Sequence, residues 1–229
     1  MNPQAEIQAG IQLVYADASL LVLDKPSGLL SVPGKGEDKQ DCLSTRVQTV
    51  YADALVVHRL DMATSGLMMM ARGSQAQRRL SDAFANRAVS KQYCALVTGR
   101  LNPAKDGWGV IDLPIALEWP RRPLRHIDAA TGKPSLTRWR LDSQASPVSA
   151  IDFEHSAAFT RLVLAPETGR SHQLRVHLAA IGHPILGDTL YAPIEVQQRA
   201  GRLLLHASDL ALTHPETGQI MQFHSPPPF

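Results

Sequence analysis

The stretch His58-Arg59-Leu60-Asp61-Met62-Ala63-Thr64-Ser65-Gly66 separates two apolar runs, residues 55–57 and residues 67–71. Short apolar runs of this kind are typical of buried strands, so the polar residues between them are expected to form a loop. A carboxylate in such a loop is placed firmly by the flanking strands and can still be reached from solvent. Because an aspartate in a loop is most often a turn or capping residue, its position alone does not make Asp61 functional.

Strand and turn signals dominate the rest of the chain. Strands are predicted at residues 11–15, 20–24, 55–57, 67–71, 93–97, 137–141, 148–153, 160–164, 203–206, 210–213 and 220–224. Helical spacing is confined to three segments, which are expected to begin at Asp41, at Ser74 with Gln77 completing a capping box, and shortly after Gly169. Strands outnumber helices and are joined mostly by hairpins and loops. The pattern therefore predicts an α+β fold with a largely antiparallel sheet.

The composition is that of a globular protein that can form one large core. Among 229 residues, 44% are hydrophobic and 19% are charged. A disordered chain would contain fewer hydrophobic and more charged residues, so this class of protein is excluded. No repeat, long linker or break in composition divides the sequence, so residues 1–229 are expected to form a single domain with a flexible start at residues 1–10. The net charge is only +2, so binding to a polyanion must depend on local clusters of basic residues.

Cys42 and Cys94 are the only cysteines, and they lack the paired spacing of a zinc ribbon or a redox motif. The small number of thiols, and the lack of a secretory pattern or a membrane-length apolar run, indicate a cytoplasmic protein with no membrane partner. His172 and His177 stand five residues apart, which would place them on different sides of a helix. The sequence therefore predicts no metal site.

The motif H-R-L-D-x-x-T-S-G of residues 58–66 resembles the catalytic motif of the pseudouridine synthases of the RluA family. Further blocks match in the family's order: L-D-K-P-S-G-L at residues 23–29, K-Q-Y at 91–93, G-R-S-H-Q-L-R-V-H at 169–177, H-P-I-L-G-D at 183–188 and L-H-A at 205–207. The resemblance therefore covers nearly the whole chain. It implies the pseudouridine synthase fold, a mixed and mostly antiparallel central sheet flanked by helices and loops, with an active-site cleft across the sheet.

This resemblance implies an isomerase that converts uridine to pseudouridine in RNA. The reaction breaks the bond between N1 of the base and C1′ of the ribose, turns the base, and joins C5 to the same carbon. It needs no external group and no redox change, so no cofactor is implied. The resemblance makes Asp61 the catalytic carboxylate. Whether Asp61 attacks the sugar, adds to the base or removes a ribose proton stays open.

The resemblance also implies partners for Asp61. Arg175 is expected to form an ion pair with it, which would keep the carboxylate ionised and fix its direction. Tyr93 is expected to stack on the target base. Because a uridine in a stem-loop is stacked, the enzyme must extrude it, and Arg59 is expected to enter the vacated stack or hold the neighbouring phosphates. Further RNA contacts are expected from His58, Arg170, His172, Arg121, Arg122 and Arg125.

The first matching block begins close to the start of the chain, so the sequence resembles the short members of the family, which lack an additional N-terminal RNA-binding domain. Those members act on tRNA anticodon stem-loops and on a loop of large-subunit ribosomal RNA, and a monomer that acts on both RNAs is expected here. An enzyme with a single RNA substrate and a non-enzymatic RNA-binding factor are the alternatives. A metal-dependent nuclease or a glycosidase would need a second acidic residue near Asp61, and the motif offers none.

Overall fold

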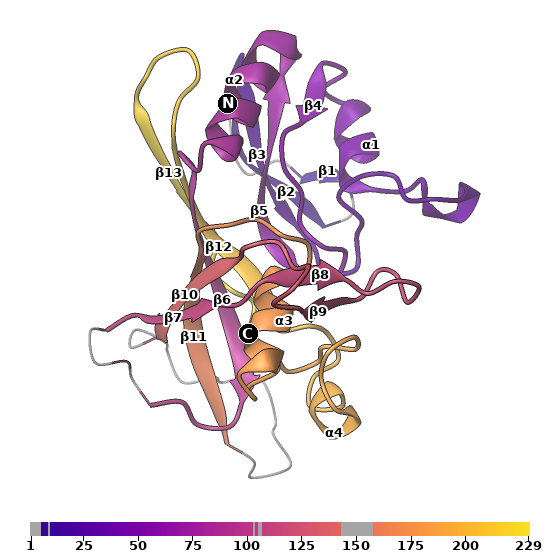
Figure 1. Ribbon diagram of the computed structural model, residues 1–229. Helices are drawn as coiled ribbons and strands as arrows, with labels where there is room; N and C mark the ends of the chain where they lie inside the picture. The colour runs from indigo at the N-terminus through magenta and orange to yellow at the C-terminus, as the bar shows by residue number, and fades with distance from the viewer. Residues whose placement is uncertain (1–5, 9, 103, 105–106, 143–157) are drawn as a thin grey trace. The chain divides into compact units, whose positions relative to one another are not determined.

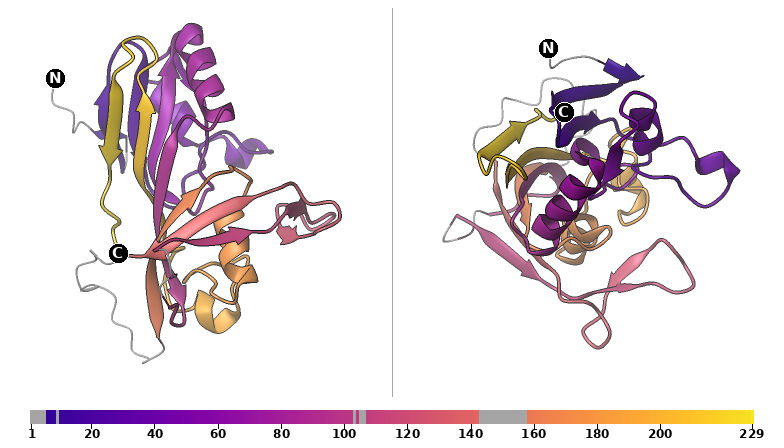
Figure 2. Two further views of the ribbon diagram at one scale, coloured as in Figure 1. Left: turned by 60° about the vertical axis from the view of Figure 1, so that its left-hand side comes forward. Right: turned by 90° about the horizontal axis from the view of Figure 1, so that it is seen from above.

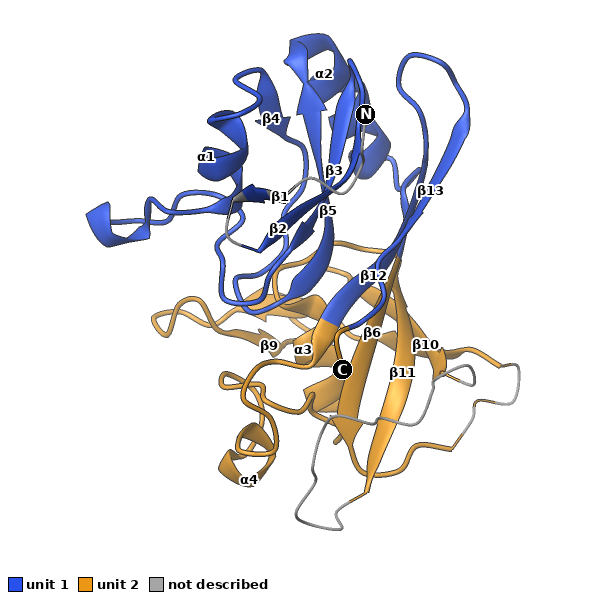
Figure 3. Cartoon of the chain, turned by 180° about the vertical axis from the view of Figure 1, so that it is seen from behind, with its two compact units in different colours: residues 1–91, 206–227 blue, residues 92–205, 228–229 orange. Residues whose placement is uncertain are grey.

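The computed structural model describes residues 6–8, 10–102, 104, 107–142 and 158–229 (Figure 1). Internal contacts divide the chain into two compact units, which Figure 3 shows in different colours. Unit 1 consists of residues 1–91 and 206–227, and unit 2 consists of residues 92–205 and 228–229. None of the helices in these described ranges combines the length and the hydropathy that crossing a membrane requires.

Unit 1 is built on a mixed β-sheet. Its strands are β1 (Glu6–Gln8), β2 (Ile11–Ala16), β3 (Leu20–Lys25), β4 (Ala54–Val56), β5 (Ser65–Arg72), β12 (Leu205–Thr213) and β13 (Ile220–His224). Strands β1, β2, β3, β5 and β12 neighbour one another in that order, while β4 pairs with β5 and β13 pairs with β12. Every pairing is antiparallel except that of β5 with β12. Strand β5, which follows the Asp61 loop, is therefore central in this sheet.

Strand β5 is buried along nearly its whole length. Helix α2 (Gly73–Ala85) covers one face of the sheet, where Ala76 and Leu80 pack into an apolar cluster with residues of β3, β5 and β12 (Figure 1). The shorter helices of unit 1, η1 (Glu37–Lys39) and α1 (Leu43–Gln48), lie between β3 and β4 in the sequence. Burial of this apolar surface is the main stabilising contribution to the frame that carries the Asp61 loop.

Gly66 allows β5 and β12 to approach each other closely. Its φ of +108° lies in the region that favours glycine, and an added Cβ atom would come within 2.3 Å of the Ala207 carbonyl oxygen. Ala207 is the residue that pairs with Gly66 in the parallel ladder. Any side chain at this position would push the two strands apart.

Unit 2 contains a four-stranded antiparallel sheet with the order β6 (Ser90–Thr98), β11 (Phe159–Pro166), β10 (Leu136–Leu141) and β7 (Gly109–Asp112). Helix α3 (Gln173–Ala180) is attached to β10 by side-chain hydrogen bonds. His177 Nδ1 lies 2.9 Å from Thr137 Oγ1, and its Nε2 lies 2.9 Å from the Leu113 carbonyl oxygen. Burial lowers the pKa of His177, which keeps the ring neutral between these partners.

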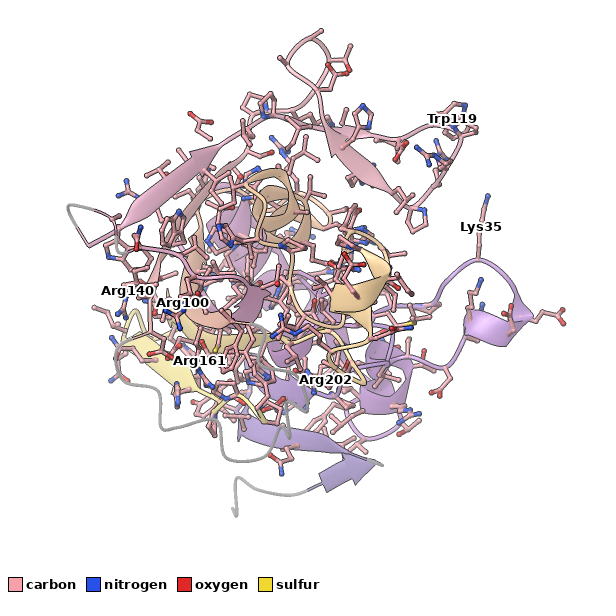
Figure 4. All side chains as sticks on the ribbon, turned by 90° about the horizontal axis from the view of Figure 1, so that it is seen from below. Lys35, Arg100, Trp119, Arg140, Arg161 and Arg202 are labelled. Atoms are coloured by element: carbon pink, nitrogen blue, oxygen red, sulfur yellow. The ribbon has the colours of Figure 1, made fainter. Side chains whose placement is uncertain are left out.

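A small hairpin of β8 (Ile115–Leu117) and β9 (Arg125–Ile127) forms a second sheet in unit 2. Figure 2 shows that this hairpin extends away from the four-stranded sheet of the same unit. Trp119 lies at its outer tip, as labelled in Figure 4, and 66% of its surface is exposed. The short helix α4 (Ile194–Gln197) follows α3 in the sequence.

The architecture confirms the predicted α+β class and the mixed, mostly antiparallel pairing of the strands. Two local expectations are wrong. The capping box does not form, because α2 already begins at Gly73 and the Gln77 amide donates instead to the Val56 carbonyl oxygen. The two strands predicted at 203–206 and 210–213 are the single strand β12. The strand predicted at 148–153 lies outside the described residues.

Candidate active site

Asp61 lies in the loop between β4 and β5, and the loop that follows β3 holds its backbone on both sides. Ser31 Oγ donates to the Leu60 carbonyl oxygen at 2.7 Å and accepts the Leu60 N–H at 3.1 Å. Ser27 Oγ donates to the Ala63 carbonyl oxygen at 2.7 Å. These bonds fix the main chain directly before Asp61 and two residues after it.

Lys25, the last residue of β3, fastens the same loop from inside the protein. Its side chain is fully buried, and its ammonium group donates to the carbonyl oxygens of Pro26 and Leu29, both at 2.8 Å, and of Met62 at 3.1 Å. The Gly28 N–H also donates to the Met62 oxygen, at 2.9 Å. Hydrogen bonds from a charged donor are strong, and a buried ammonium needs them to offset its lost hydration. The peptide that follows the candidate carboxylate is therefore strongly anchored.

His58 anchors the start of the loop. Its Nε2 accepts the Met69 N–H at 2.9 Å, and its ring stacks on Phe84 of α2 with the centroids 4.4 Å apart. Burial, and to a smaller extent the positive charge of Lys91, lower the pKa of His58 to about 3. The ring is therefore neutral at physiological pH. One nitrogen and one face of the ring are engaged inside unit 1, which suits a structural contact better than the RNA contact expected from the sequence.

Arg59 and Asp61 are both more exposed than Leu60, which lies between them. Leu60 between them is buried, whereas Arg59 is exposed and Asp61 is half-buried. Met62 is also exposed, with 52% of its surface accessible. The loop thus combines a fixed backbone with a carboxylate and a guanidinium that can be reached from solvent.

Tyr93 lies in β6 and pairs with Leu164 of β11. It is half-buried, while the residues from Cys94 to Val97 that follow it are buried. Tyr93 therefore stands where the buried part of β6 begins, and the strand holds its backbone rigidly.

Arg175 is buried in α3, and its carboxylate partner within unit 2 is Asp188. Its Nε lies 2.9 Å from Asp188 Oδ2, and a second nitrogen lies 2.5 Å from Oδ1. The ion pair is almost completely enclosed, with 4% of the Arg175 side chain and 1% of the Asp188 side chain exposed. A bidentate pair of this kind fixes the plane of the guanidinium.

His172 and Arg170 lie at the N-terminal end of α3. His172 has a φ of +58° and precedes the first residue of the helix. Its Nδ1 lies 2.6 Å from the hydroxyl oxygen of Tyr191. Arg170 is exposed, and its Nε donates to the Pro134 carbonyl oxygen at 3.4 Å. Both residues are accessible at least in part, as an RNA contact requires.

The three remaining arginines belong to the β8–β9 hairpin. Arg122 is exposed, with its guanidinium carbon 3.6 Å from the centroid of the Trp119 ring, and Arg121 is exposed and paired with Glu118. Arg125 is the first residue of β9, directly after the turn, and its Nε is enclosed and has no hydrogen-bond partner among the described residues. A cation stacked on an exposed indole is an arrangement that suits phosphates and unstacked bases.

Sequence reasoning assigned no role to several residues that position the candidate site. Lys25 and Asp188 lie within the quoted family blocks, and a charged residue in a predicted strand end or core signals that a buried partner is needed. Ser31 and Tyr191 carried no comparable signal. Among the described residues, no three His, Cys, Asp or Glu side chains are grouped as a metal ion would require.

Comparisons with known proteins identify the family to which the chain belongs. The chain matches the RNA pseudouridylate synthase family model over residues 19–180. It is 46% identical over 228 residues to the dual-specificity RNA pseudouridine synthase RluA of Escherichia coli, with 100% of this chain and 97% of the relative covered. The RluA protein of Vibrio parahaemolyticus is 43% identical, with 90% of this chain and 78% of the relative covered.

Solved structures lead to the same fold. Human RNA pseudouridylate synthase domain containing 1 superposes with a TM-score of 0.76 and 26% identity, covering 100% of this chain and 87% of that one. Human RNA pseudouridylate synthase domain containing 4 superposes with a TM-score of 0.69 and 22% identity, covering 94% and 88% of the two chains, and this likeness concerns the fold alone. The protein therefore belongs to the RNA pseudouridylate synthase family and is an isomerase that acts on uridine in RNA.

Proposed function

We propose that this pseudouridine synthase modifies two kinds of RNA, the anticodon stem-loop of tRNA and a loop of large-subunit ribosomal RNA. The resemblance of its motifs to the short members of the RluA family supports this proposal. So does the full-length similarity to proteins named as dual-specificity RNA pseudouridine synthases. The two stem-loops differ in sequence, but in each of them the target uridine would lie in a loop from which it can leave its stack.

We assign the catalytic carboxylate to Asp61. The observation that carries this assignment is the anchored loop of unit 1, in which hydrogen bonds hold the carbonyl groups of Leu60, Met62 and Ala63 while Asp61 keeps access to solvent. A carboxylate placed in this way can act at the ribose or the base without waiting for the loop to order. No atom is gained or lost in the reaction, since the glycosidic bond from N1 is replaced by one from C5.

Arg175 and Tyr93 are proposed to act on the same uridine as Asp61. The guanidinium of Arg175 would stabilise the ionised carboxylate, and Asp188 supports this role because it fixes the plane of the guanidinium. Tyr93 would stack on the extruded base, for which its place on a rigid strand is suitable. We propose that the two units work as one catalytic domain, in a monomer located in the cytoplasm.

RNA binding and base extrusion are proposed to depend on exposed cations. Arg59, next to the buried Leu60, would fill the space that the uridine leaves. Arg170, His172 and the hairpin arginines would hold the RNA backbone.

The decisive experiment compares the wild-type protein with Asp61→Asn on both RNAs. An anticodon stem-loop and a fragment of large-subunit ribosomal RNA, each containing uridine, are incubated with protein in the presence of EDTA. Pseudouridine is then mapped by chemical labelling. We expect product in both RNAs with wild type and none with Asp61→Asn, while the affinity for RNA changes less than about threefold because the loop backbone is unchanged.

Asp82→Asn serves as the matched control, because Asp82 is an exposed aspartate of unit 1 on α2. It should form product at the wild-type rate. If pseudouridine formed in only one of the two RNAs, the protein would be a single-substrate enzyme and the proposal of dual specificity would be wrong. Full activity of Asp61→Asn would contradict the assignment of Asp61 as the catalytic carboxylate.

A further inference from the structure

Tyr191 connects two of the proposed RNA-binding elements of unit 2. It lies between α3 and α4, and its hydroxyl oxygen accepts the backbone N–H of Arg125 at 3.0 Å. The same oxygen lies 2.6 Å from Nδ1 of His172. The start of β9, next to the hairpin turn, and the start of α3 are therefore joined through one phenol group.

The contact with Tyr191 bears on which nitrogen of His172 carries its proton. In the arrangement proposed below, the Tyr191 hydroxyl accepts the Arg125 N–H and donates its own proton to Nδ1 of His172. An Nδ1 that accepts this proton leaves the neutral ring protonated at Nε2. The second nitrogen of the ring then acts as a donor, as a contact to a phosphate or a base oxygen needs.

The aromatic ring of Tyr191 also contacts Arg175. The guanidinium carbon of Arg175 lies 5.2 Å from the ring centroid, within the range of cation–π attraction. His172 meets the same ring edge-on, with the centroids 5.6 Å apart. One side chain thus touches both the histidine that precedes α3 and the arginine inside it.

The carboxylate of Asp188 binds both the backbone at Tyr191 and the guanidinium of Arg175. Its Oδ1 accepts the backbone N–H groups of Leu190 at 2.9 Å and Tyr191 at 3.2 Å, in addition to the bond from Arg175. The turn before Asp188 requires Gly187, whose φ is +73° and whose added Cβ would lie 1.9 Å from the Arg202 carbonyl oxygen. The backbone that carries Tyr191 is consequently fixed by the same carboxylate that fixes Arg175.

We propose that Tyr191 is a positioning residue of the synthase, which orients His172 through its hydroxyl and Arg175 through its ring. This inference rests on the proposed function, because it takes His172 as an RNA contact and Arg175 as the partner of Asp61. The two parts of the side chain have separable tasks. The hydroxyl affects RNA binding, and the ring affects the chemical step.

The test uses Tyr191→Phe, which removes only the hydroxyl, and Tyr191→Leu, which also removes the ring. For Tyr191→Phe we expect the KM for the anticodon stem-loop to rise about tenfold with kcat within twofold of wild type, as for the loss of one well-placed hydrogen bond. For Tyr191→Leu we expect the same rise in KM and, in addition, a fall of about tenfold in kcat, since Arg175 loses its cation–π partner.

A spectroscopic signature distinguishes positioning from a purely structural role. In ¹⁵N-histidine-labelled protein at pH 8, the signals of His172, assigned by their loss in His172→Gln, should show an unprotonated Nδ1 in wild type and a mixture of tautomers in Tyr191→Phe. Tyr15→Phe is the matched control, because the Tyr15 hydroxyl donates to Asp17 at 2.8 Å in unit 1. It should leave KM, kcat and the His172 signals unchanged.

The proposal is overturned if Tyr191→Phe leaves both the His172 signals and the KM unchanged, or if its effects equal those of Tyr15→Phe. Failure of the proposed function looks different, because wild-type protein would then form no pseudouridine in either RNA. In that case the His172 signals and the dissociation constant for the stem-loop still decide the role of the hydroxyl.

Discussion

The guanidinium of Arg175 and the carboxylate of Asp188 form a bidentate ion pair that is almost completely removed from solvent. Two charges buried together depend on each other, because either one alone would lose its hydration without compensation. The pair therefore serves two purposes in unit 2. It stabilises the segment after α3, and it fixes the direction of an arginine that the synthase is proposed to use.

Replacing Asp188 by Asn should lower both stability and activity. Removal of one partner of a buried pair costs about 3–5 kcal/mol. Urea unfolding followed by circular dichroism should show that loss, and single-turnover assays at low temperature should show a lower rate constant for product formation. The exposed pair of Arg46 and Asp41 is the matched control, since 65% of the Asp41 side chain is accessible. Asp41→Asn should leave the free energy of unfolding nearly unchanged, because an exposed ion pair contributes little. A similar loss in both variants would contradict the role of burial.

Ser31→Ala should impair catalysis although Ser31 touches no reacting group. The substitution removes both hydrogen bonds to Leu60, next to the carboxylate, and leaves the N–H and C=O of Leu60 without these partners. We expect a loss of about 2 kcal/mol in stability and a decrease of about tenfold or more in kcat. Ser135→Ala is the control, because Ser135 is equally buried and its Oγ donates to Lys133. An unchanged kcat for Ser31→Ala would show that Leu60 does not position Asp61.

His58 should make the stability of the protein depend on pH between 7 and 5. Its pKa in the folded state is about 3, against 6.5 for an ordinary histidine. As the pH falls below 6.5 the unfolded chain takes up a proton that the folded protein does not, so the folded state loses stability. The expected loss from this residue between pH 7 and pH 5 is about 2 kcal/mol.

Urea unfolding of wild type and His58→Gln at the two pH values measures this contribution. The glutamine keeps an acceptor for the Met69 N–H but does not titrate. The free energy of unfolding of His58→Gln should therefore fall by about 2 kcal/mol less than that of wild type between pH 7 and pH 5. His58→Leu, which lacks the acceptor, should also show a lower kcat. Equal pH dependence in wild type and His58→Gln would refute the neutral state of the ring.

Arg122→Ala should weaken RNA binding in a manner that depends on salt. Removing one cation that neutralises a phosphate lowers the slope of log affinity against log salt concentration by about 0.7–0.9. Filter-binding titrations of the stem-loop over a range of KCl concentrations give this slope. Arg79→Ala is the matched control, because Arg79 is a partly exposed arginine of unit 1 paired with Glu216. An unaltered slope for Arg122→Ala would exclude the hairpin tip from the phosphate contacts.

Much of the fold could be predicted because hydrophobic patterning determines which strands exist. The apolar residues of β3 and β5 are buried on both sides, and their runs are visible in the sequence. The hairpin of β8 and β9 was missed, since its three-residue strands and its Trp119-Pro120 segment show no alternation. The split of 203–213 into two strands was also wrong, because Ser208 and Asp209 read as a turn although β12 continues through them.

The candidate site was less predictable than the fold. Asp61 and Arg175 could be chosen from motifs, but their surroundings could not. Ser31 holds Leu60, next to Asp61, by hydrogen bonds, and the ring of Tyr191 lies against the Arg175 guanidinium. A motif records the types of residue that a site needs. It does not record which ring nitrogen accepts a hydrogen bond, as in His58, whose contacts with Phe84 and the Met69 N–H are visible only in the structure.

The anchoring of Leu60, Met62 and Ala63 by the loop after β3 has a consequence for the choice of substrate. A catalytic group that is already in place draws none of the free energy of RNA association for its own ordering. The conformational change that accompanies binding, and its cost in free energy, then lie mainly in the RNA. Discrimination among uridines should accordingly follow how readily each loop lets a nucleotide swing outward, so that pliable loops of unlike sequence become equivalent to the enzyme.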